Sequence, residues 1–174
     1  VGAPYYHTAG TYGHIYVYHG SAGGVINEAL KHPSVETVKY AELDPLLLDL
    51  LRKFPTPLTE SELNDRRVEI KHIDGRLLLK TTRNTYDLIL VGIMEPSNLQ
   101  TNRFFTKEFF SLVKTRLNKG GILVLGLPGS LMYVNEELKN LNGCIFHTLK
   151  SVFSSIRVFP GDGTNLFFSS ERYD

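Results

Sequence analysis

The chain has 174 residues, and its 19 basic and 18 acidic side chains give a formal net charge of +1. Its hydrophobic fraction of 42% and charged fraction of 21% are those of an ordinary globular protein of one domain. The balanced charge argues against a nucleic-acid binder that relies on a basic surface, and no apolar run approaches the roughly 18 residues needed to span a bilayer.

The first half of the chain alternates short β-branched or aromatic runs with amphipathic stretches. Residues 14–19 predict a first strand, and a glycine-rich turn then leads into a helix over residues 25–32. Residues 36–41 predict a second strand. Asp44 is expected to cap the next helix, which has a proline in its first turn and leucines on one face. The polar, proline-marked segment 54–64 predicts a loop or short helical turns.

The second half continues the alternation. Residues 67–72 predict a third strand, and a short helical piece begins at Asp74. The continuous apolar run 86–91 is typical of a central parallel strand covered on both faces. Residues 106–117 predict a strongly amphipathic helix that ends in a glycine cap at residues 118–121. The remaining expected elements are a strand over 122–126, a helix over 134–152, and an antiparallel pair over 155–159 and 165–169.

This order of elements predicts the fold class. Strands that alternate with helices favour a parallel sheet with helices on both faces. The last two strands have no helix between them, which indicates an antiparallel hairpin at one edge. We therefore expect an α/β, Rossmann-like fold with a seven-stranded, mostly parallel sheet. Residues 1–13 fit no element and are interpreted as the remnant of a preceding segment, with residues 14–174 as a single domain.

The loop after the first strand is the first candidate for a binding site. In an open α/β sheet, ligands bind beyond the carboxyl ends of the strands, where the strand order reverses. Gly20, Gly23 and Gly24, with Ser21 between them, let a ligand approach the backbone at the start of a helix. Glu42 stands at the end of the second strand, where an acid can accept hydrogen bonds from ribose hydroxyls. The loop and Glu42 together predict a nucleoside site.

A second acid follows at the end of the third strand. Asp74 could accept a hydrogen bond from the exocyclic amine of a purine while Gly75 lets the chain turn past the ring. It could equally cap its own short helix. No Gly-Lys-Ser/Thr pattern is present to hold phosphates, and the glycine spacing is not that of the dinucleotide fingerprint. The expected ligand is therefore a nucleoside rather than a di- or triphosphate.

Histidines and the single cysteine suggest no further site. His72 and Asp74 lie on one side of a strand end, but no His-x-x-x-His or cysteine pair completes a metal site, so we expect no metal. Cys144 excludes an internal disulfide and fits a reducing compartment, which favours a cytoplasmic location. Its sequence surroundings favour a buried structural residue over a nucleophile.

Taken together, these residues resemble the spermidine/spermine synthase (aminopropyltransferase) family over roughly residues 17–169. The motifs that carry the resemblance are Gly23-Gly24-Val25, Glu28, Leu30-Lys-His-Pro-Ser-Val35-Glu-Thr-Val38, Glu42-Leu-Asp-Pro45, Asp74-Gly-Arg76, Tyr86-Asp87, Glu95-Pro96, Phe105-Thr-Lys-Glu-Phe109 and Leu117-Asn-Lys-Gly-Gly-Ile122. The end of the chain, from Leu127-Pro-Gly129 onward, is similar to members that are fused to a membrane-embedded region. The resemblance thus implies the soluble portion of a longer, membrane-anchored protein, and it leaves a homodimer open.

The resemblance implies a class I methyltransferase-like fold and a transferase of polyamine biosynthesis. Such enzymes move the aminopropyl group of decarboxylated S-adenosylmethionine to an amine such as putrescine and release methylthioadenosine, with no prosthetic group. Carried over by motif, Glu42, with Leu43 beside it, would hold the ribose, and Asp74 with Gly75 the adenine side. Glu95 would act as the base and anchor of the amine. The expected partners are thus a nucleoside and a polyamine.

Three positions depart from the family's pattern. Ala22 and Gly92 stand where the family usually has aspartates, and Glu95 replaces a third. These non-standard residues leave two alternatives open: a nucleoside-binding regulatory domain with impaired catalysis, and a methyltransferase that uses S-adenosylmethionine itself. The nucleoside half of the site keeps the family's residues, so all three hypotheses share the same pocket.

Overall fold

A computed structural model describes residues 13–18, 24–93 and 95–171. Residues 1–12 lie outside the described part, so the interpretation of residues 1–13 as a remnant stays a prediction. The strands are β1 His14–Tyr18, β2 Thr37–Ala41, β3 Val68–Lys71, β4 Tyr86–Val91, β5 Leu117–Gly129, β6 Ser155–Phe159 and β7 Gly163–Ser170. The helices are α1 Val25–Leu30, α2 Pro45–Lys53, α3 Pro57–Asn64, α4 Gly75–Thr81, α5 Leu99–Asn102, α6 Lys107–Lys114 and α7 Glu136–Lys150.

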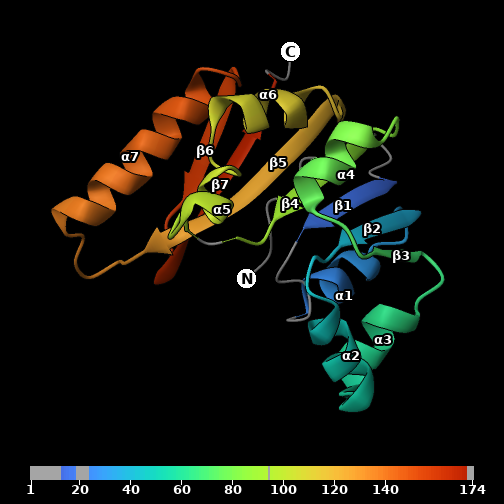
Figure 1. The fold of residues 1–174 in the computed structure, drawn as a ribbon. Helices are drawn as coiled ribbons and strands as arrows, with labels where there is room; N and C mark the ends of the chain where they lie inside the picture. Colours follow the sequence, from blue (N-terminus) through green and yellow to red (C-terminus); the bar gives the residue numbers. More distant parts are fainter. Residues whose placement is uncertain (1–12, 19–23, 94, 172–174) are drawn as a thin grey trace.

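The strands form one seven-stranded sheet in the order β3-β2-β1-β4-β5-β7-β6, with helices on both faces (Figure 1). The pairs among β1 to β5 are parallel, and β7 runs antiparallel to both β5 and β6. This arrangement confirms the predicted α/β class and the antiparallel edge hairpin. The order reverses between β1 and β4, whose last residues Tyr18 and Val91 pair in register. A ligand crevice is therefore expected just beyond these two residues.

Two hydrophobic clusters hold the helices to the sheet. Ile15 and Val17 of β1 face the cluster that α1, α2 and α3 cover, whereas Tyr16 and Tyr18 face the cluster beneath α4, α6 and α7. Figure 1 shows these two groups of helices on opposite sides of the sheet. Side chains alternate along a strand, so a central strand covered on both faces needs apolar residues at every position. No helix within the described ranges is long and apolar enough to cross a bilayer.

The segment expected as a loop or short turns contains a regular helix, α3. Pro57 occupies its first turn, and Thr56 caps it by accepting a hydrogen bond from the Thr59 amide at 3.2 Å. Thr59 completes a capping box, because its hydroxyl accepts from the Thr56 amide at 2.9 Å. The sequence thus carries the signals of a helix start, although Thr59 occupies the third position of the capping box, where glutamate is more usual. Glu62 on this helix is buried.

The predicted glycine cap at residues 118–121 is wrong. Helix α6 already ends at Lys114, and Asn118 to Gly121 belong to β5. Gly120 has a φ of 79°, a left-handed conformation, where the β4–β5 register shifts between Tyr86 and Leu88. The Asp87 carboxylate accepts hydrogen bonds from the Asn118 side chain at 2.7 Å and the His14 amide at 3.0 Å, so it links three strands at this end. The glycines therefore serve an irregular strand rather than a helix end.

Candidate functional site

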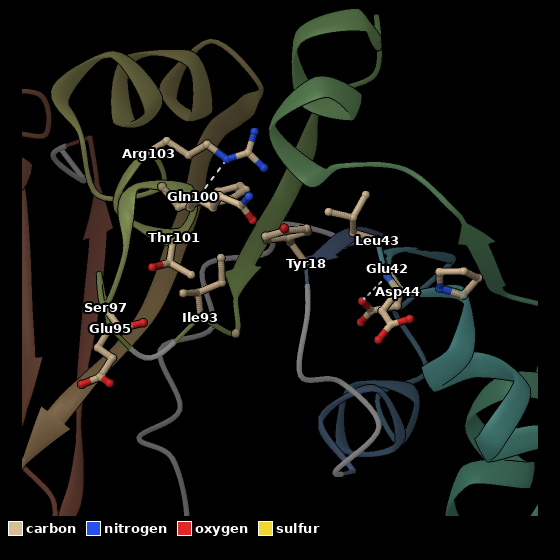
Figure 2. Close-up of a pocket in the computed structure, with 13 residues that line it drawn as sticks. Tyr18, Glu42, Leu43, Asp44, Ile93, Glu95, Ser97, Gln100, Thr101 and Arg103 are labelled. Atoms are coloured by element: carbon tan, nitrogen blue, oxygen red, sulfur yellow. Dashed lines mark hydrogen bonds between the residues drawn. The ribbon is translucent and has the colours of Figure 1, made fainter.

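A cavity of about 590 Å³ opens at the carboxyl ends of β1, β2 and β4. Its walls come from Tyr18, from residues 42–45 after β2, and from residues 92–104, which follow β4 and include α5. Figure 2 shows Glu42, Leu43 and Asp44 on one side and Glu95, Ser97 and Thr101 on the other, with Tyr18 between them. The cavity thus lies at the reversal point of the strand order, where the topology predicts a ligand site.

Glu42 lies where the sequence analysis expected it and is fully buried. Its Oε2 accepts a hydrogen bond from the Tyr40 hydroxyl at 2.9 Å, and its Oε1 accepts from the Asp44 amide at 3.0 Å. These two bonds fix the carboxylate at the end of β2. Each carboxylate oxygen can accept more than one hydrogen bond. The contact of Glu42 with ribose hydroxyls stays a prediction. Asp44, interpreted from the sequence only as a helix cap, does cap α2 and also lines the cavity.

The glycine loop is described only at its end. Gly24 has a φ of 100° and forms the N-cap of α1, a left-handed conformation that favours glycine. Gly20, Ser21, Gly23 and the departure at Ala22 fall within residues 19–23, outside the described residues. The prediction that they contact a nucleoside therefore stays a prediction.

Of the two roles that the sequence left open for Asp74, the structure shows the helix cap. Its Oδ1 accepts a hydrogen bond from the Leu77 amide at 2.9 Å, so it caps α4. Its Oδ2 pairs with the guanidinium of Arg103. Asp74 also lines a second cavity of about 640 Å³, which shares Leu43, Gln100 and Arg103 with the first. The helix cap is thus established by the geometry, and a purine amine would have to share Oδ2 with Arg103.

Gly75 is buried beneath an aromatic ring of the protein itself. A Cβ at this position would overlap the ring of Tyr18. The Gly75 carbonyl accepts a hydrogen bond from the Tyr16 hydroxyl at 2.9 Å, which draws the start of α4 against β1. The ring that this glycine accommodates in the structure is therefore that of Tyr18.

Tyr18 and Arg103 form a further part of the site, and the sequence predicted no role for Arg103. The ring of Tyr18 stacks on Phe104 with centroids 4.6 Å apart, and the Arg103 guanidinium lies 4.8 Å from the centroid of Phe104. Burial, with a further contribution from the Asp74 carboxylate, raises the pKa of Tyr18 to about 12. Its hydroxyl thus stays protonated at neutral pH. The Asn98 and Thr101 capping box predicts helix α5, but no local pattern predicts that Arg103 reaches Asp74.

Glu95 lines the cavity on the wall opposite Glu42. Its side chain is exposed, and it makes no hydrogen bond or ion pair with the described residues. Pro96, whose φ is fixed by its ring, follows Glu95. Three residues before Glu95, the Gly92 amide donates a hydrogen bond to the Tyr18 carbonyl at 2.8 Å. An exposed carboxylate at the mouth of a cavity can attract and hold an ammonium group.

The charged groups of the cavity favour a cationic ligand. Glu42, Asp44 and Glu95 contribute carboxylates, whereas the one guanidinium among the lining residues, that of Arg103, is paired with Asp74. Acidic walls of this kind raise the local concentration of positively charged ligands. Among the residues that the structure describes, no three His, Cys, Asp or Glu side chains are placed to hold a metal ion. Cys144 is exposed on α7, so the prediction that it is buried is wrong.

Comparison with known proteins places the chain in a sequence family. A family model described as the spermine/spermidine synthase domain matches residues 6–172. The polyamine aminopropyltransferase of Bacillus subtilis (strain 168) is 30% identical over 167 residues, which cover 92% of this chain and 58% of that relative. The chain therefore spans a little over half the length of this relative.

Solved structures agree with the fold. A spermidine synthase in complex with the transition state analogue AdoDATO has a TM-score of 0.77 at 24% identity, over 93% of this chain and 56% of its own. The human methyltransferase-like protein 13, in complex with SAH, has a TM-score of 0.73 at 18% identity, over 92% of this chain and 72% of its own. These likenesses establish the class I methyltransferase-like fold that the resemblance implied.

Proposed function

The chain belongs to the spermine/spermidine synthase family, and we propose that it is an aminopropyltransferase whose cavity binds decarboxylated S-adenosylmethionine. The observation that carries this proposal is the placement of Glu42 and Glu95 on opposite walls of one acidic cavity. One carboxylate is buried and fixed by two hydrogen bonds, as a ribose anchor should be. The other is exposed, as a residue that receives an amine from solution should be.

In the proposed complex, the nucleoside lies along the ends of β1, β2 and β3. Glu42 accepts hydrogen bonds from the ribose hydroxyls, and Gly24 ends the loop that passes close to the ligand. The adenine lies on the side of Asp74 and Leu43, in the second cavity. The acidic walls favour the sulfonium and ammonium charges of the donor over a neutral or anionic nucleoside.

The proposed reaction is a displacement at the carbon beside the sulfonium. A free amine attacks this carbon, the new C–N bond forms, and the C–S bond breaks with its electron pair passing to sulfur. The products are neutral methylthioadenosine and an ammonium that loses a proton. Glu95 would hold the incoming amine and take its proton, which positions the nucleophile and keeps it unprotonated. A polyamine is the acceptor class that suits acidic walls, and the transfer requires no prosthetic group.

Replacement of Glu95 tests the catalytic part of the proposal. Glu95→Gln keeps the size of the side chain but removes its charge and basicity, so amine-dependent release of methylthioadenosine should nearly cease. Chromatographic assay of methylthioadenosine with decarboxylated S-adenosylmethionine and common polyamines measures this. Glu137→Gln, the same change at an exposed acid of α7, is the matched control and should leave the rate unchanged. Absence of turnover by the unaltered protein with every common polyamine would contradict the proposed activity.

Replacement of Glu42 tests the binding part. Methylthioadenosine should raise the melting temperature of the unaltered protein, because a ligand that binds only the folded state stabilises it. Glu42→Ala should remove this shift. Binding without turnover would instead identify a nucleoside-binding regulatory domain. A higher calorimetric affinity for S-adenosylmethionine than for its decarboxylated form would identify a methyltransferase.

A further inference from the structure

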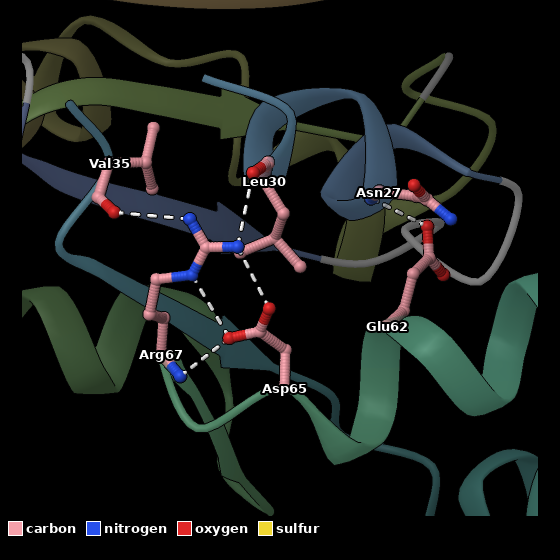
Figure 3. Close-up of polar contacts among 6 residues, drawn as sticks. All are labelled: Asn27, Leu30, Val35, Glu62, Asp65 and Arg67. Carbon is pink, nitrogen blue, oxygen red and sulfur yellow. Dashed lines mark hydrogen bonds and ion pairs between the residues drawn. The ribbon is translucent and has the colours of Figure 1, made fainter. Parts of the chain in front are cut away.

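Glu62 of α3 is a buried carboxylate that lines neither cavity. Glu62 is 1% exposed. Within the described part of the chain, no hydrogen bond or ion pair joins its carboxylate to a basic side chain. Its Oε1 accepts a hydrogen bond from the Asn27 amide at 2.9 Å, as Figure 3 shows. The backbone amide of Gly24 acts on the same carboxyl group and lowers its pKa. Both amides belong to the start of α1, an element that α3 packs against.

These two amides are groups that a helix start leaves without a partner inside the helix. Gly24 is the N-cap of α1, and no side-chain hydrogen bond from the N-cap residue itself satisfies the first turn. Glu62 supplies the missing acceptor from another helix. Leu58, one turn before Glu62, lies 3.3 Å from the position that a Cβ on Gly24 would take. Helix α3 therefore contacts the last residue of the glycine loop through both a polar and an apolar side chain.

Stability alone does not account for a charged residue at this place. Burial raises the pKa of Glu62, although the two amide hydrogen bonds act in the opposite direction. A buried carboxylate that has no cation beside it lowers the stability of a fold relative to a neutral side chain of the same shape. The carboxylate does orient the backbone amides of Gly24 and Asn27, and Gly24 is the last residue of the glycine loop.

We propose that Glu62 is a positioning residue for the nucleoside site: its carboxylate fixes Gly24 and the first turn of α1, and so sets the end of the glycine loop without touching the nucleoside. The inference rests on the proposed function, because it takes the cavity to be a nucleoside site. It adds a determinant of donor affinity on α3, a helix that contributes no side chain to the cavity.

Two variants and one control test this role. Glu62→Leu removes the acceptor, whereas Glu62→Gln keeps one oxygen in place without the charge. Glu60→Gln makes the same chemical change on the exposed face of α3 and should change nothing. The measurements are the calorimetric Kd for methylthioadenosine, the melting temperature at pH 8, and the hydrogen exchange rates of the Gly24 and Asn27 amides by NMR. With an active enzyme, KM for the donor and kcat are measured separately.

The loss of hydrogen bonds to a charged group predicts a Kd for methylthioadenosine about tenfold higher in Glu62→Leu, with a smaller rise in Glu62→Gln. The Gly24 and Asn27 amides should exchange faster in Glu62→Leu. The melting temperature of Glu62→Gln should not fall, and KM for the donor should rise while kcat stays within about twofold.

Two results would overturn the inference while leaving the proposed function intact. One is an unchanged Kd in both variants although the unaltered protein binds methylthioadenosine. The other is a lower melting temperature in both variants with no change in Kd or KM, which is the result of a purely structural role. Failure of the unaltered protein to bind methylthioadenosine would refute the proposed function, and this inference with it.

Discussion

Gly75 and Gly143 differ in the space that surrounds them, so the same substitution by alanine should have opposite effects on stability at the two positions. A methyl group on Gly75 would overlap the Tyr18 ring, whereas one on Gly143 of α7 would meet nothing within 4 Å. Gly75→Ala should therefore destabilise the fold by about 1–3 kcal/mol through overpacking. Gly143→Ala should stabilise it by roughly 0.5–1 kcal/mol, because alanine suits a helix interior better than glycine. Urea unfolding of both variants measures the two changes, and equal signs would contradict the packing described at Gly75.

Asp65 gives a prediction about pH. Its carboxylate pairs with Arg67 at 2.8 Å, and Arg67 in turn donates to the carbonyls of Leu30 at 3.0 Å and Val35 at 3.4 Å (Figure 3). Hydrogen bonding to the Arg67 guanidinium lowers the pKa of Asp65 from 3.8 to about 2. The folded state thus favours the ionised form, so the contribution to stability is present above pH 3.8 and is lost as the pH falls toward 2.

Asp65→Asn should therefore melt a few degrees lower than the unaltered protein at pH 6, and this difference should vanish near pH 2. Thermal unfolding followed by circular dichroism across this range measures the difference. Asp49→Asn is the control, because Asp49 is largely exposed and lies 3.7 Å from Arg52. A pair of that kind contributes little. A difference between Asp65→Asn and the unaltered protein that did not change with pH would contradict the assignment.

Single residues differ in how far the sequence could predict their roles. The position of Glu42 was predictable, because a residue at this distance along the chain after a glycine loop falls at the end of the second strand. The contact between Asp74 and Arg103 was not, because it joins two residues 29 positions apart, one at the start of α4 and the other just after α5. The Tyr18 ring over Gly75 was hidden for the same reason, since nothing local indicates that a distant tyrosine will occupy that space.

At the scale of elements, the capping box of α3 gives the next prediction. Thr56→Ala removes the side-chain oxygen that accepts from the Thr59 amide, so the free energy of unfolding should fall by about 1 kcal/mol. Chemical denaturation measures this change. Ser61→Ala, a comparable deletion of a hydroxyl at an exposed position of α3, should have little effect. An equal loss in both variants would show that the hydroxyl of Thr56 has no special role.

Helix α3 and the start of β5 show why some elements were predicted incompletely. The capping signals of α3 were present, but its eight residues carry little apolar periodicity, so a polar loop was equally consistent with the pattern. The glycines at 120 and 121 match a helix C-cap in sequence. The chain instead leaves the helix earlier, where Tyr86 donates its amide to the Arg116 carbonyl and the β4–β5 pairing begins. Pairing with β4 places these glycines in a strand. A local sequence pattern carries no information about this pairing.

At the scale of the whole molecule, the alternation of strands and helices was sufficient to predict the fold class. The alternation was not sufficient to predict the order of the strands. It does not say that the strand after β3 in the sequence pairs with β1, on the side away from β2. The structure shows that β4 is the strand that lies on the other side of β1. The cavity follows from the order alone, since residues 42–45 and 92–104 meet only if β1 lies between β2 and β4.

The distribution of charge gives a prediction at this scale. The acidic cavity should attract decarboxylated S-adenosylmethionine electrostatically but not neutral methylthioadenosine. Raising the ionic strength from about 0.05 M to about 0.5 M should therefore weaken binding of the donor several-fold and leave methylthioadenosine nearly unaffected. Calorimetric titrations of both ligands at the two salt concentrations measure this. Equal salt dependence of the two affinities would mean that the acids of the cavity do not act on the donor's charge.

Because the strand order reverses between β1 and β4, the two walls of the cavity come from two separate segments of the chain. The wall that carries Glu42 is encoded before residue 75, and the wall that carries Glu95 is encoded after residue 90. The two walls are nevertheless joined, by the ion pair of Asp74 with Arg103 and by the stacking of Tyr18 on Phe104. A substitution at either contact is therefore expected to affect both walls. The departures from the family's usual residues also fall in both segments, at Ala22 before residue 75 and at Gly92 and Glu95 after residue 90.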